Sequence, residues 1–506
     1  MVKGIYISAL CVEVVRLKSS KAMIVLLLLV LGALTLPRCS ILLGHAATIH
    51  VPADYSTIQK AVNAANINDT IMVSPGTYYG PLSLNKTVHL VGVGRDGTIL
   101  DGQGQGPVLN VTANAATITS FTIQNAVFDG QAVELFKVKN VNVTGNNIIA
   151  SPTGASPSGA GVDLIRSNNT VIDGNTFMRN LYAVNLTWST QNRISNNHME
   201  NSDSVGISVT NSFGNLIIGN SFVSNQEGID LTGASSSLNN VTRNLFRSAS
   251  FTGVFLLYNP LDNTFAENTF TLNHIGVDMQ NATGNTFYHN SFLRTGLIIN
   301  GRVRHINHVF SSDGTSDFWD NRSLGGPVRG GNYWDDYSGT DVDGDGIGDT
   351  PYYFATNSTQ YDSRPLMAPF APVPLALAGV TASPTSGSAP FTATFKADVL
   401  GSLKPITYSW IFGDGSTSDS SVSPSHTFAM PGNYTIRLTV GDTSGATETG
   451  MVNILVSSPG PAPWVIPAII VLAVGIMITV LLFYRKRSKM SKNESVQGGT
   501  TGSLPH

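Results

Sequence analysis

The sequence predicts an all-β protein in which a parallel β-helix is followed by a small β-sandwich and one C-terminal transmembrane helix. Three observations support this. A short asparagine-containing phrase returns every 21 to 29 residues, and alternating strands broken by Gly and Pro turns follow residue 375. A long apolar run lies near the C-terminus.

Residues 1–47 are interpreted as a signal peptide or an N-terminal anchor. The apolar stretch Met23–Leu36 follows several basic residues, and its 14 residues suit a signal-peptide core better than a membrane span. Gly44–Ala47 offers small residues for cleavage. Both cysteines, Cys11 and Cys39, precede that point, so we expect no disulfide and no thiolate metal site in the mature chain.

A short helix is predicted over Tyr55–Ala65, where the apolar residues have helical spacing and Ser56 or Thr57 can cap the N-terminus. Strands at 70–73 and 88–92 follow it. The helix is expected to cover the open end of the β-helix and to shield its exposed sheet edge.

The repetitive part, residues 48–330, carries two phrases at one period. The first is Asn-x-aromatic or aliphatic, and it begins at Asn146, Asn175, Asn196, Asn220, Asn244, Asn268 and Asn290. The second runs in phase and begins at Gly161, Ala183, Gly206, Gly228, Gly253 and Gly276. Two interleaved phrases indicate stacked units, and the alternation of apolar residues within each unit is the period of a strand. Each unit of about two dozen residues is therefore predicted to be one coil of a parallel β-helix.

The repeated residues are interpreted as structural. Asn tolerates left-handed backbone angles and bonds its neighbours in a turn, and stacked Asn side chains can also hydrogen-bond along a ladder. The apolar residue that follows each Asn is expected to point inward and to stack on its counterparts.

A family resemblance accompanies this pattern. The segments TIQKAV, NDTIMVSPGTYYGPLSL, VHLVGVG and TILDG resemble the opening of the pectin-lyase-like, right-handed parallel β-helix superfamily. The Asn-rich coils resemble its NosD-type branch, which occurs in many archaeal and bacterial surface or periplasmic proteins. The resemblance covers about residues 49–370 and implies the fold. It implies no activity, because this scaffold serves lyases, hydrolases, adhesins and non-catalytic proteins.

Residues 331–370 are predicted to form a C-terminal cap that holds calcium in a structural role. The front of an EF-hand-like loop is reproduced by Asp341, Asp343, Asp345, the Ile347 carbonyl and Asp349. A solvated acidic turn is the alternative. The segment also resembles a terminal segment common in NosD-type surface proteins.

One calcium ligand is missing from this loop. Position 12 is Tyr352, where an EF-hand has a bidentate Glu. The missing carboxylate must come from elsewhere, and the candidates are Asp335, Asp336 and Asp362.

Residues 375–457 are predicted to be a small β-sandwich that follows a Pro/Ala-rich linker. The phrases YSWIFGDG, SHTF and PGNYTIRLTV resemble those of a PKD domain and occur in order across the segment. Trp410 is expected in its core. Such domains usually act as spacers or adhesive modules, and a stalk is the expected role here.

Residues 464–484 form an apolar run of the right length to cross a bilayer, with Trp464 and Tyr484 at its ends. Basic residues follow directly, so the positive-inside rule places 485–506 in the cytoplasm and the preceding chain outside the cell.

Composition excludes one class of partner. Only 61 of 506 residues are charged and the net charge is −3, so there is no nucleic-acid footprint. The low charge and abundant Asn, Ser, Thr and Gly suit a glycan-like environment. Sequons that could carry sugars begin at Asn68, Asn110, Asn185, Asn281 and Asn433.

Three functions are weighed, and the first is non-catalytic binding of carbohydrate or another envelope component by a membrane-anchored surface protein. Long repetitive faces with Asn, Ser, Thr and aromatic residues suit extended polymers, and Trp188, Phe255 and Tyr258 are candidate stacking residues. This function is preferred, because β-helix, calcium cap, sandwich and anchor form the layout of an adhesin.

The alternative is a polysaccharide lyase or glycoside hydrolase. Asp163, Asp230 and Asp278 occupy one outward position of their coils, and Asp230 and Asp278 would lie roughly 10 Å apart with Phe255 between them. The Lys, Arg and Asp signatures of β-helix lyases and hydrolases are not found, so no catalytic residue is assigned.

The second alternative is a NosD-like role in copper-site maturation. Copper needs clustered His, Met or Cys ligands. His305 and His308 are three residues apart and would face opposite sides of a strand, while nothing requires His274 or His289 to lie beside them.

Overall fold

The computed structural model describes most of the chain. Its described residues are 46–127, 130–149, 159–299, 302–306, 308–311, 317–321, 330–354, 360–370, 375–400, 406–442, 446–459 and 465–494. The predicted signal peptide, with Cys11 and Cys39, lies outside these ranges apart from its last two residues.

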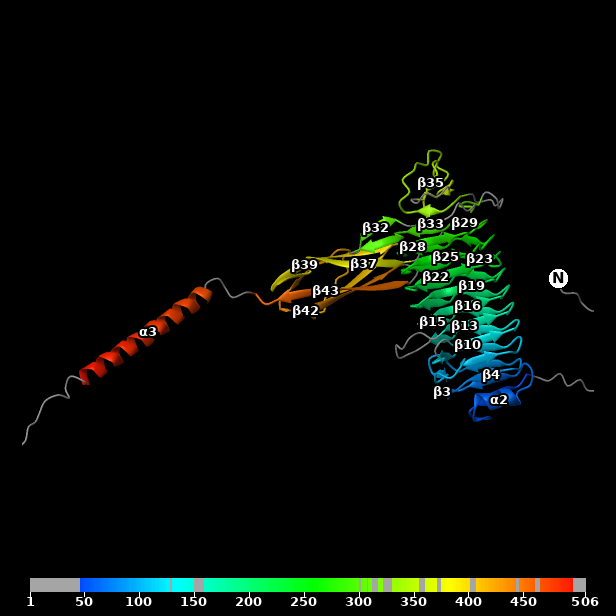
Figure 1. Cartoon of the computed structure of the whole chain (residues 1–506), viewed down its shortest axis with the longest axis horizontal. Coiled ribbons are helices and arrows are strands. Elements are labelled where there is room, and N and C mark those ends of the chain that lie inside the picture. The colour runs from blue at the N-terminus through cyan, green and yellow to red at the C-terminus, as the bar shows by residue number, and fades with distance from the viewer. Residues whose placement is uncertain are drawn as a thin grey trace, which may run out of the picture. The chain divides into compact units, whose positions relative to one another are not determined.

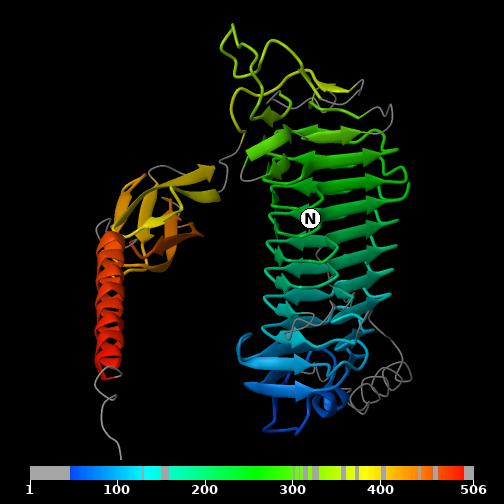
Figure 2. The same cartoon turned by 60° about the vertical axis from the view of Figure 1, so that its left-hand side comes forward.

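Three parallel sheets form the β-helix, and successive coils add one strand to each of them (Figures 1 and 2). Sheet A holds β1 (Thr48–Val51), β2 (Thr70–Val73), β5 (His89–Gly92), β8 (Thr117–Thr119), β11 (Asn142–Thr144), β14 (Val171–Asp173), β17 (Arg193–Ser195), β20 (Leu216–Ile218), β23 (Asn240–Thr242), β26 (Thr264–Ala266) and β29 (Thr286–Tyr288).

Sheet B is also 11-stranded. It holds β3 (Gly76–Tyr79), β6 (Thr98–Asp101), β9 (Thr122–Gln124), β12 (Asn147–Ile149), β15 (Thr176–Met178), β18 (His198–Glu200), β21 (Ser221–Val223), β24 (Leu245–Arg247), β27 (Thr269–Thr271), β30 (Ser291–Leu293) and β34 (Tyr333–Trp334). Its last strand lies in the segment predicted as the cap, so that segment continues the solenoid.

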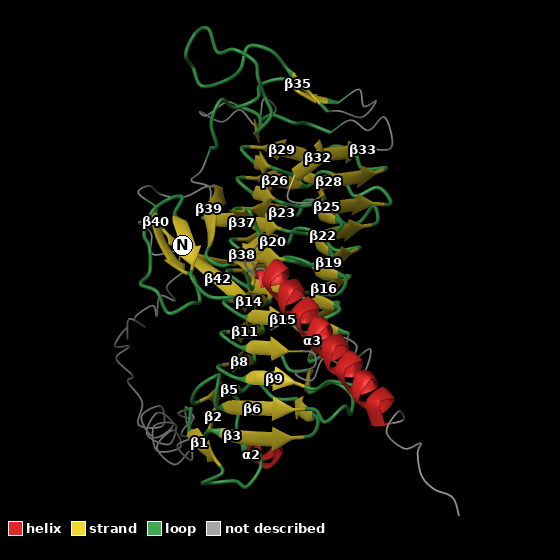
Figure 3. Ribbon diagram, turned by 90° about the vertical axis from the view of Figure 1, so that its left-hand side faces the viewer, coloured by secondary structure: helices red, strands yellow, loops and turns green. Residues whose placement is uncertain are grey.

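Sheet C is 10-stranded. It holds β4 (Leu82–Leu84), β7 (Leu109–Val111), β10 (Val133–Phe136), β13 (Ala160–Ile165), β16 (Tyr182–Thr187), β19 (Val205–Thr210), β22 (Glu227–Thr232), β25 (Thr252–Leu257), β28 (Ile275–Gln280) and β33 (Val309–Ser311). Two hairpins follow the main coils: β31 (Gly296–Ile299) with β32 (Arg302–Ile306), and β35 (Tyr352–Tyr353) with β36 (Tyr361–Asp362). In Figure 3 the β-helix consists of strands joined by loops, with one short helix, α2, at its first coils.

A ladder of buried asparagines connects the coils at one corner. In each rung the Oδ1 of one Asn accepts both the backbone N–H and the Nδ2–H of the Asn one coil earlier, as Asn220 does for Asn197, at 3.0 Å each. The Nδ2 of Asn220 in turn donates to the Ile194 carbonyl at 2.9 Å. The members are at most 2% exposed, and they are Asn146, Asn175, Asn197, Asn220, Asn244, Asn268, Asn290 and Asn332. The predicted ladder is therefore present.

The structure corrects the predicted phrase by one residue in one coil. The ladder member is Asn197, whereas Asn196 has a φ of 53° and lies in the turn before it. The residue before a ladder Asn has a left-handed φ in most coils, as Gly219 and Arg243 do. The left-handed turn and the ladder bond therefore belong to two adjacent residues.

The apolar residues two positions after the ladder asparagines stack inside the solenoid, as predicted. Phe222, Phe246, Phe270 and Phe292 lie face to face at centroid distances of 4.6 to 4.8 Å. Trp334 continues the stack at 4.4 Å from Phe292. The indole extends the same apolar core into the cap.

The predicted N-terminal helix is present as α2 (Ile58–Ala64) and packs at the first coils (Figure 1). Thr57 is its N-cap, and the Thr57 hydroxyl accepts the Lys60 N–H at 3.2 Å. Ile58, Ala61 and Val62 are buried against the solenoid core. The helix therefore protects the apolar interior of the first coils from water.

The second domain is a sandwich of two sheets with a core of its own. One sheet holds β37 (Ala376–Ser383), β39 (Phe391–Leu400) and β41 (Ser425–Phe428). The other holds β38 (Ser386–Ser388), β43 (Thr447–Ser457), β42 (Gly432–Gly441) and β40 (Thr407–Ile411). Trp410 is fully buried in the core, as expected, and its indole N–H donates to the Ser421 carbonyl at 2.9 Å.

The C-terminal helix α3 (Val465–Glu494) contains residues 465–484 of the predicted apolar run, and Trp464 lies outside the described residues. Within the described residues, Ile469–Arg487 is the one helical stretch long and apolar enough to cross a membrane, judged by length and composition. It overlaps the predicted span of 464–484.

We predict that Asn220→Ala destabilises the β-helix by about 3 kcal/mol, because it leaves the buried donors of Asn197 and the Ile194 carbonyl without partners. Asn240→Ala, at an exposed position of β23, is the control. Urea unfolding of the full-length chain, followed by far-UV circular dichroism, measures both. Equal unfolding midpoints for the two variants would contradict a stabilising ladder.

Candidate functional site

A row of polar side chains, interrupted by Phe255 and followed by Phe310 on β33, runs along the outer face of sheet C. Register pairing places its members on successive strands, each one coil from the next, and they are Asn110, Glu134, Asp163, Asn185, Ser208, Asp230, Phe255 and Asp278. This "sheet C row" confirms that Asp163, Asp230 and Asp278 share one position and that Phe255 lies between Asp230 and Asp278. Two coil spacings separate those carboxylates by about 10 Å.

The row is recessed and its carboxyl groups are hydrogen-bonded to neighbours. Asp163 and Asp278 are 5% and 3% exposed. The Nδ2 of Asn185 donates to Asp163 at 3.0 Å, and the Thr232 hydroxyl donates to Asp230 at 2.7 Å. The Oδ1 atom of Asp278 is buried and has no hydrogen-bond partner within the described part of the chain.

These carboxyl groups have raised pKa values. Burial raises the pKa of Asp163 and of Asp278 to about 6, although hydrogen bonds from Asn185 and Gln280 oppose the shift. Burial, and then the charges of Asp230 and Asp278, raise the pKa of Glu227 to about 7. Glu227 opens β22 and was not singled out from the sequence. Near neutral pH, Glu227 is therefore protonated in about half of the molecules, and Asp163 and Asp278 are mostly ionised.

Exposed aromatic side chains flank the row at the end of the sheet C strands. Trp188 and Tyr258 directly follow β16 and β25 and are 53% and 66% exposed. Both have left-handed backbone angles, with φ of 53° and 60°, which bulky residues seldom adopt. Phe255 is half-buried and makes an edge contact with Phe251 at 5.7 Å. The three predicted stacking residues therefore lie on or beside the sheet C row.

The predicted calcium loop brings three carboxylates together. Asp341, Asp343 and Asp345 each offer an oxygen, and these oxygens all lie within 4.8 Å of one another. Backbone N–H groups hold them in place, since the two Asp341 oxygens accept from Gly344 and Gly346 at 2.7 and 3.0 Å. Asp349 lies beside them and accepts the Val342 N–H at 2.8 Å.

The three carboxylates considered for the missing calcium ligand have other partners. Asp362 is fully buried and accepts N–H groups from Asn332, Trp334 and Arg364 at 2.6 to 3.0 Å. Asp335 and Asp336 are paired with His308. None of the three belongs to the group formed by the loop aspartates.

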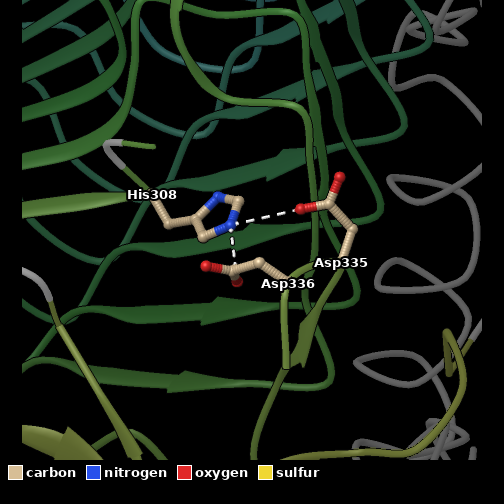
Figure 4. Close-up of side chains that lie close together, drawn as sticks. All are labelled: His308, Asp335 and Asp336. Atoms are coloured by element: carbon tan, nitrogen blue, oxygen red, sulfur yellow. Dashed lines mark hydrogen bonds and ion pairs between the residues drawn. The ribbon is translucent and has the colours of Figure 1, made fainter. Parts of the chain in front are cut away.

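A histidine and two aspartates form a second group (Figure 4). His308 directly precedes β33, and Asp335 and Asp336 directly follow β34. The His308 Nε2 lies 3.2 Å from Asp335 Oδ1 and 3.1 Å from Asp336 Oδ1. Burial alone would lower the pKa of His308, but the hydrogen bonds and charges of the two carboxylates raise it. His308 was a candidate copper ligand, and Asp335 and Asp336 were candidate calcium ligands. The aspartates lie 27 and 28 residues after His308 in the sequence, and no local pattern indicates that the three side chains meet.

Of the other histidines weighed for copper, His274 and His289 do not join this group. Among the described residues, groups of three or more close ligands comprise only His308 with Asp335 and Asp336, and the three loop aspartates. His289 stacks on Phe370 at 3.8 Å, and the side chain of His305 lies outside the described atoms. Neither group offers the thiolate or thioether that favours Cu(I).

A cavity of about 340 Å³ lies at the first coils, beside α2. Tyr78, Tyr79 and Pro81 line it together with Ser56 and Gln59. It contains none of the residues predicted for binding or catalysis, so it is not assigned a role.

Together these features define a parallel β-helix protein with a β-sandwich domain and a C-terminal apolar helix. Residues 112–339 match the family described as periplasmic copper-binding protein (NosD), and residues 371–456 match the PKD domain. The chain therefore carries a NosD-type β-helix followed by a PKD domain, and both predicted resemblances are confirmed. No curated protein sequence matches the chain.

Solved structures with a similar fold are remote in sequence. An alginate lyase from Paenibacillus sp. str. FPU-7 is 13% identical, with a TM-score of 0.34 over 47% of this chain and 99% of that chain. An α-1,3-glucanase catalytic domain in complex with tetrasaccharides is 14% identical, with a TM-score of 0.34 over 53% and 69% of the two chains. A tailspike protein variant of E. coli bacteriophage HK620 in complex with a pentasaccharide is 13% identical, with a TM-score of 0.40 over 55% and 61%. Similarity at this level does not establish what this chain binds.

We predict that Glu227→Gln changes the pH dependence of stability. Because the pKa of Glu227 is raised from 4.5 to about 7, the folded chain holds this proton more tightly than the unfolded chain does. The resulting stabilisation is full below the ordinary value and is lost as the pH rises through about 7. Relative to the wild type, the variant should therefore gain thermal stability across this pH window.

Thermal unfolding of the full-length chain at a series of pH values tests this prediction. Asp203→Asn, at an exposed carboxylate, is the control for the loss of one carboxylate charge. A pH-independent difference between the Glu227 variant and the wild type would show that the environment of Glu227 does not raise its pKa.

Proposed function

We propose that this protein is a membrane-anchored cell-surface protein whose sheet C row binds a carbohydrate polymer of the envelope or of the surroundings. The observation that carries the proposal is the row of Asn, Ser, Asp and Glu side chains in register on successive coils, with Phe255 within the row and Trp188 and Tyr258 beside it. Carboxylate and amide oxygens accept hydrogen bonds from sugar hydroxyl groups, and aromatic faces stack on the apolar faces of sugar rings. A repeat of one polar position per coil suits an extended chain better than a compact ligand.

The charge of the row favours an uncharged polymer. Glu134, Asp163, Glu227, Asp230 and Asp278 place five carboxyl groups on this face. Uronic acid polymers would be repelled by those that are ionised, because like charges at short range cost free energy. A neutral glycan meets no such repulsion, so it is the expected ligand.

Localisation follows from the C-terminal helix and the two domain types. The stretch Ile469–Arg487 is long and apolar enough to span a membrane, and Arg485 with the basic residues after it supports a cytoplasmic C-terminal tail by the positive-inside rule. The β-helix and the PKD domain then lie outside the cell, and the PKD domain serves as the stalk.

Glycoside hydrolysis is the second candidate function, and one observation favours it. The pKa of about 7 at Glu227 suits a general acid, and Asp230 and Asp278 are close enough for their charges to contribute to that shift. In this reaction Glu227 would protonate the leaving oxygen and Asp230 or Asp278 would assist the attack of water.

We predict that the full-length chain in detergent retains neutral polysaccharides and not alginate-like polyuronates. Trp188→Ala and Tyr258→Ala should each weaken binding by about tenfold, or about 1.4 kcal/mol, because each removes an exposed stacking surface. Tyr79→Ala, at an equally exposed tyrosine of sheet B, is the matched control.

Affinity electrophoresis measures retention, and mass spectrometry of the same mixtures detects released oligosaccharides. Fragments that disappear in Glu227→Gln would establish hydrolysis in place of simple binding. If the Tyr79 variant weakened binding and the Trp188 and Tyr258 variants did not, the binding face would not be sheet C.

We also propose that calcium binds Asp341, Asp343, Asp345, the Ile347 carbonyl and Asp349. Three convergent carboxylates repel one another by about 1 kcal/mol per pair in water, which a hard divalent cation with oxygen ligands relieves. Ile347 pairs with Leu366, and the Gly348 N–H donates to the Pro365 carbonyl at 2.8 Å. Bound calcium would therefore fix this part of the cap.

We predict that calcium raises the thermal unfolding midpoint of the cap and that a calcium chelator lowers it. A free calcium concentration of 100 times Kd adds about 2.7 kcal/mol to the free energy of unfolding. Asp343→Asn should abolish the shift, whereas Asp203→Asn should retain it. Calorimetry of the full-length chain measures the shift, and its absence in the wild type would exclude a stabilising calcium site.

A further inference from the structure

His308, Asp335 and Asp336 converge from two different sheets of the β-helix. His308 directly precedes β33 of sheet C, and the two aspartates directly follow β34 of sheet B. Figure 4 shows both carboxylates directed at the same edge of the imidazole ring. One nitrogen and two oxygens thus face a common point, at N···O distances of 3.2 and 3.1 Å.

Hydrogen bonding alone does not provide a partner for both carboxylate oxygens. The Nε2 atom carries at most one proton, yet two carboxylate oxygens lie within hydrogen-bond distance of it. Two carboxylates around one imidazolium also leave a net charge of −1. A divalent cation bound by a neutral imidazole and two carboxylates leaves no net charge, and it bonds to all three atoms at once.

The other end of each side chain is already held by a partner. The Thr295 hydroxyl is hydrogen-bonded to His308 Nδ1. The Arg294 backbone N–H donates to Asp335 Oδ2 at 2.7 Å, and the Tyr352 hydroxyl donates to Asp336 Oδ2 at 3.2 Å. Metal ligands in proteins are oriented by such outer partners, which fix the tautomer of the histidine and the rotation of the carboxylates.

The histidine side of the group is buried among aromatic rings, and the carboxylate side is open to solvent. The His308 side chain is 1% exposed, and its ring lies 5.6 Å from that of Trp334 and 5.9 Å from that of Phe292. The Asp335 and Asp336 side chains are 24% and 31% exposed. An ion can therefore enter from solvent past the carboxylates and meet the buried nitrogen.

We propose that His308 Nε2, Asp335 Oδ1 and Asp336 Oδ1 bind a divalent first-row transition ion of the zinc type. Ligand atoms around a tetrahedral ion with bonds of about 2.0 Å lie about 3.3 Å apart, close to the two N···O distances of 3.2 and 3.1 Å. One nitrogen and two oxygens suit Zn²⁺, whereas calcium prefers the all-oxygen set of the acidic loop. Three protein ligands leave the fourth position open to water or a ligand group. The site is separate from the sheet C row and does not depend on the glycan proposal.

Metal titration of the full-length chain tests this site. The chain, in detergent and stripped by a chelator, is kept in excess calcium so that the acidic loop is not available to the probe. Zn²⁺ binding is then followed by calorimetry, and Co²⁺ binding by its visible absorption, which reports nitrogen ligation and low coordination number. The wild type should bind one Zn²⁺ and give an intense tetrahedral Co²⁺ spectrum.

Two variants distinguish an effect on Zn²⁺ binding from an effect on folding. Asp336→Asn removes a ligand charge and should weaken Zn²⁺ binding by more than 100-fold, while Tyr352→Phe removes only an outer partner and should weaken it by about tenfold. Tyr352→Phe keeps the aromatic ring that stacks on Trp334, so it tests the site even if Asp336→Asn does not fold.

Asp343→Asn is the matched control, because it removes a carboxylate charge from the acidic loop and should leave Zn²⁺ affinity unchanged. Three results would overturn the proposal: no tetrahedral Co²⁺ spectrum in the wild type, equal Zn²⁺ affinity in the wild type and both site variants, or loss of Zn²⁺ binding in Asp343→Asn instead.

Discussion

The rest of the structure depends on one constraint: the buried backbone N–H groups at the corners of each coil need hydrogen-bond acceptors. A parallel β-helix turns several times per coil, and every turn interrupts the sheet hydrogen bonds and buries N–H groups. The asparagine ladder supplies the missing acceptors, since each Oδ1 takes both donors of the Asn one coil earlier. A second ladder repeats this at another corner, through Asn192, Asn215, Asn239, Asn263 and Asn285.

Everything functional on sheet C follows from that regularity. Because the ladders fix one coil directly above the next, the outward position two residues before each strand end recurs in register, and Asp230, Phe255 and Asp278 line up. The stacked phenylalanines inside set the same spacing. A face of this kind can follow an extended polymer because its chemistry repeats along one axis. The raised pKa values arise because the row is recessed, not because of a specialised loop.

Features with a periodic signal could be predicted from the sequence, whereas features without one could not. The inward phenylalanines and the outward aspartates were predicted correctly, because alternation in a strand assigns faces directly. The register of Asn196 and Asn197 was wrong by one residue, since two adjacent asparagines fit the phrase equally well and only the bond to Asn220 distinguishes them. Glu227 was overlooked because its burial and its charged neighbours cannot be seen in a strand pattern.

The sequence by itself determined the fold class, the coil period, the sandwich domain, the apolar C-terminal helix and the acidic loop, because each is encoded within a few dozen consecutive residues. Only the tertiary structure decided which chemistry the cap brings together. His308 and Asp336 meet because Trp334 docks on Phe292 and sets β34 beside β30, which places the aspartates over the end of sheet C. Contacts of that kind depend on how separate segments close one apolar core, so no local pattern encodes them.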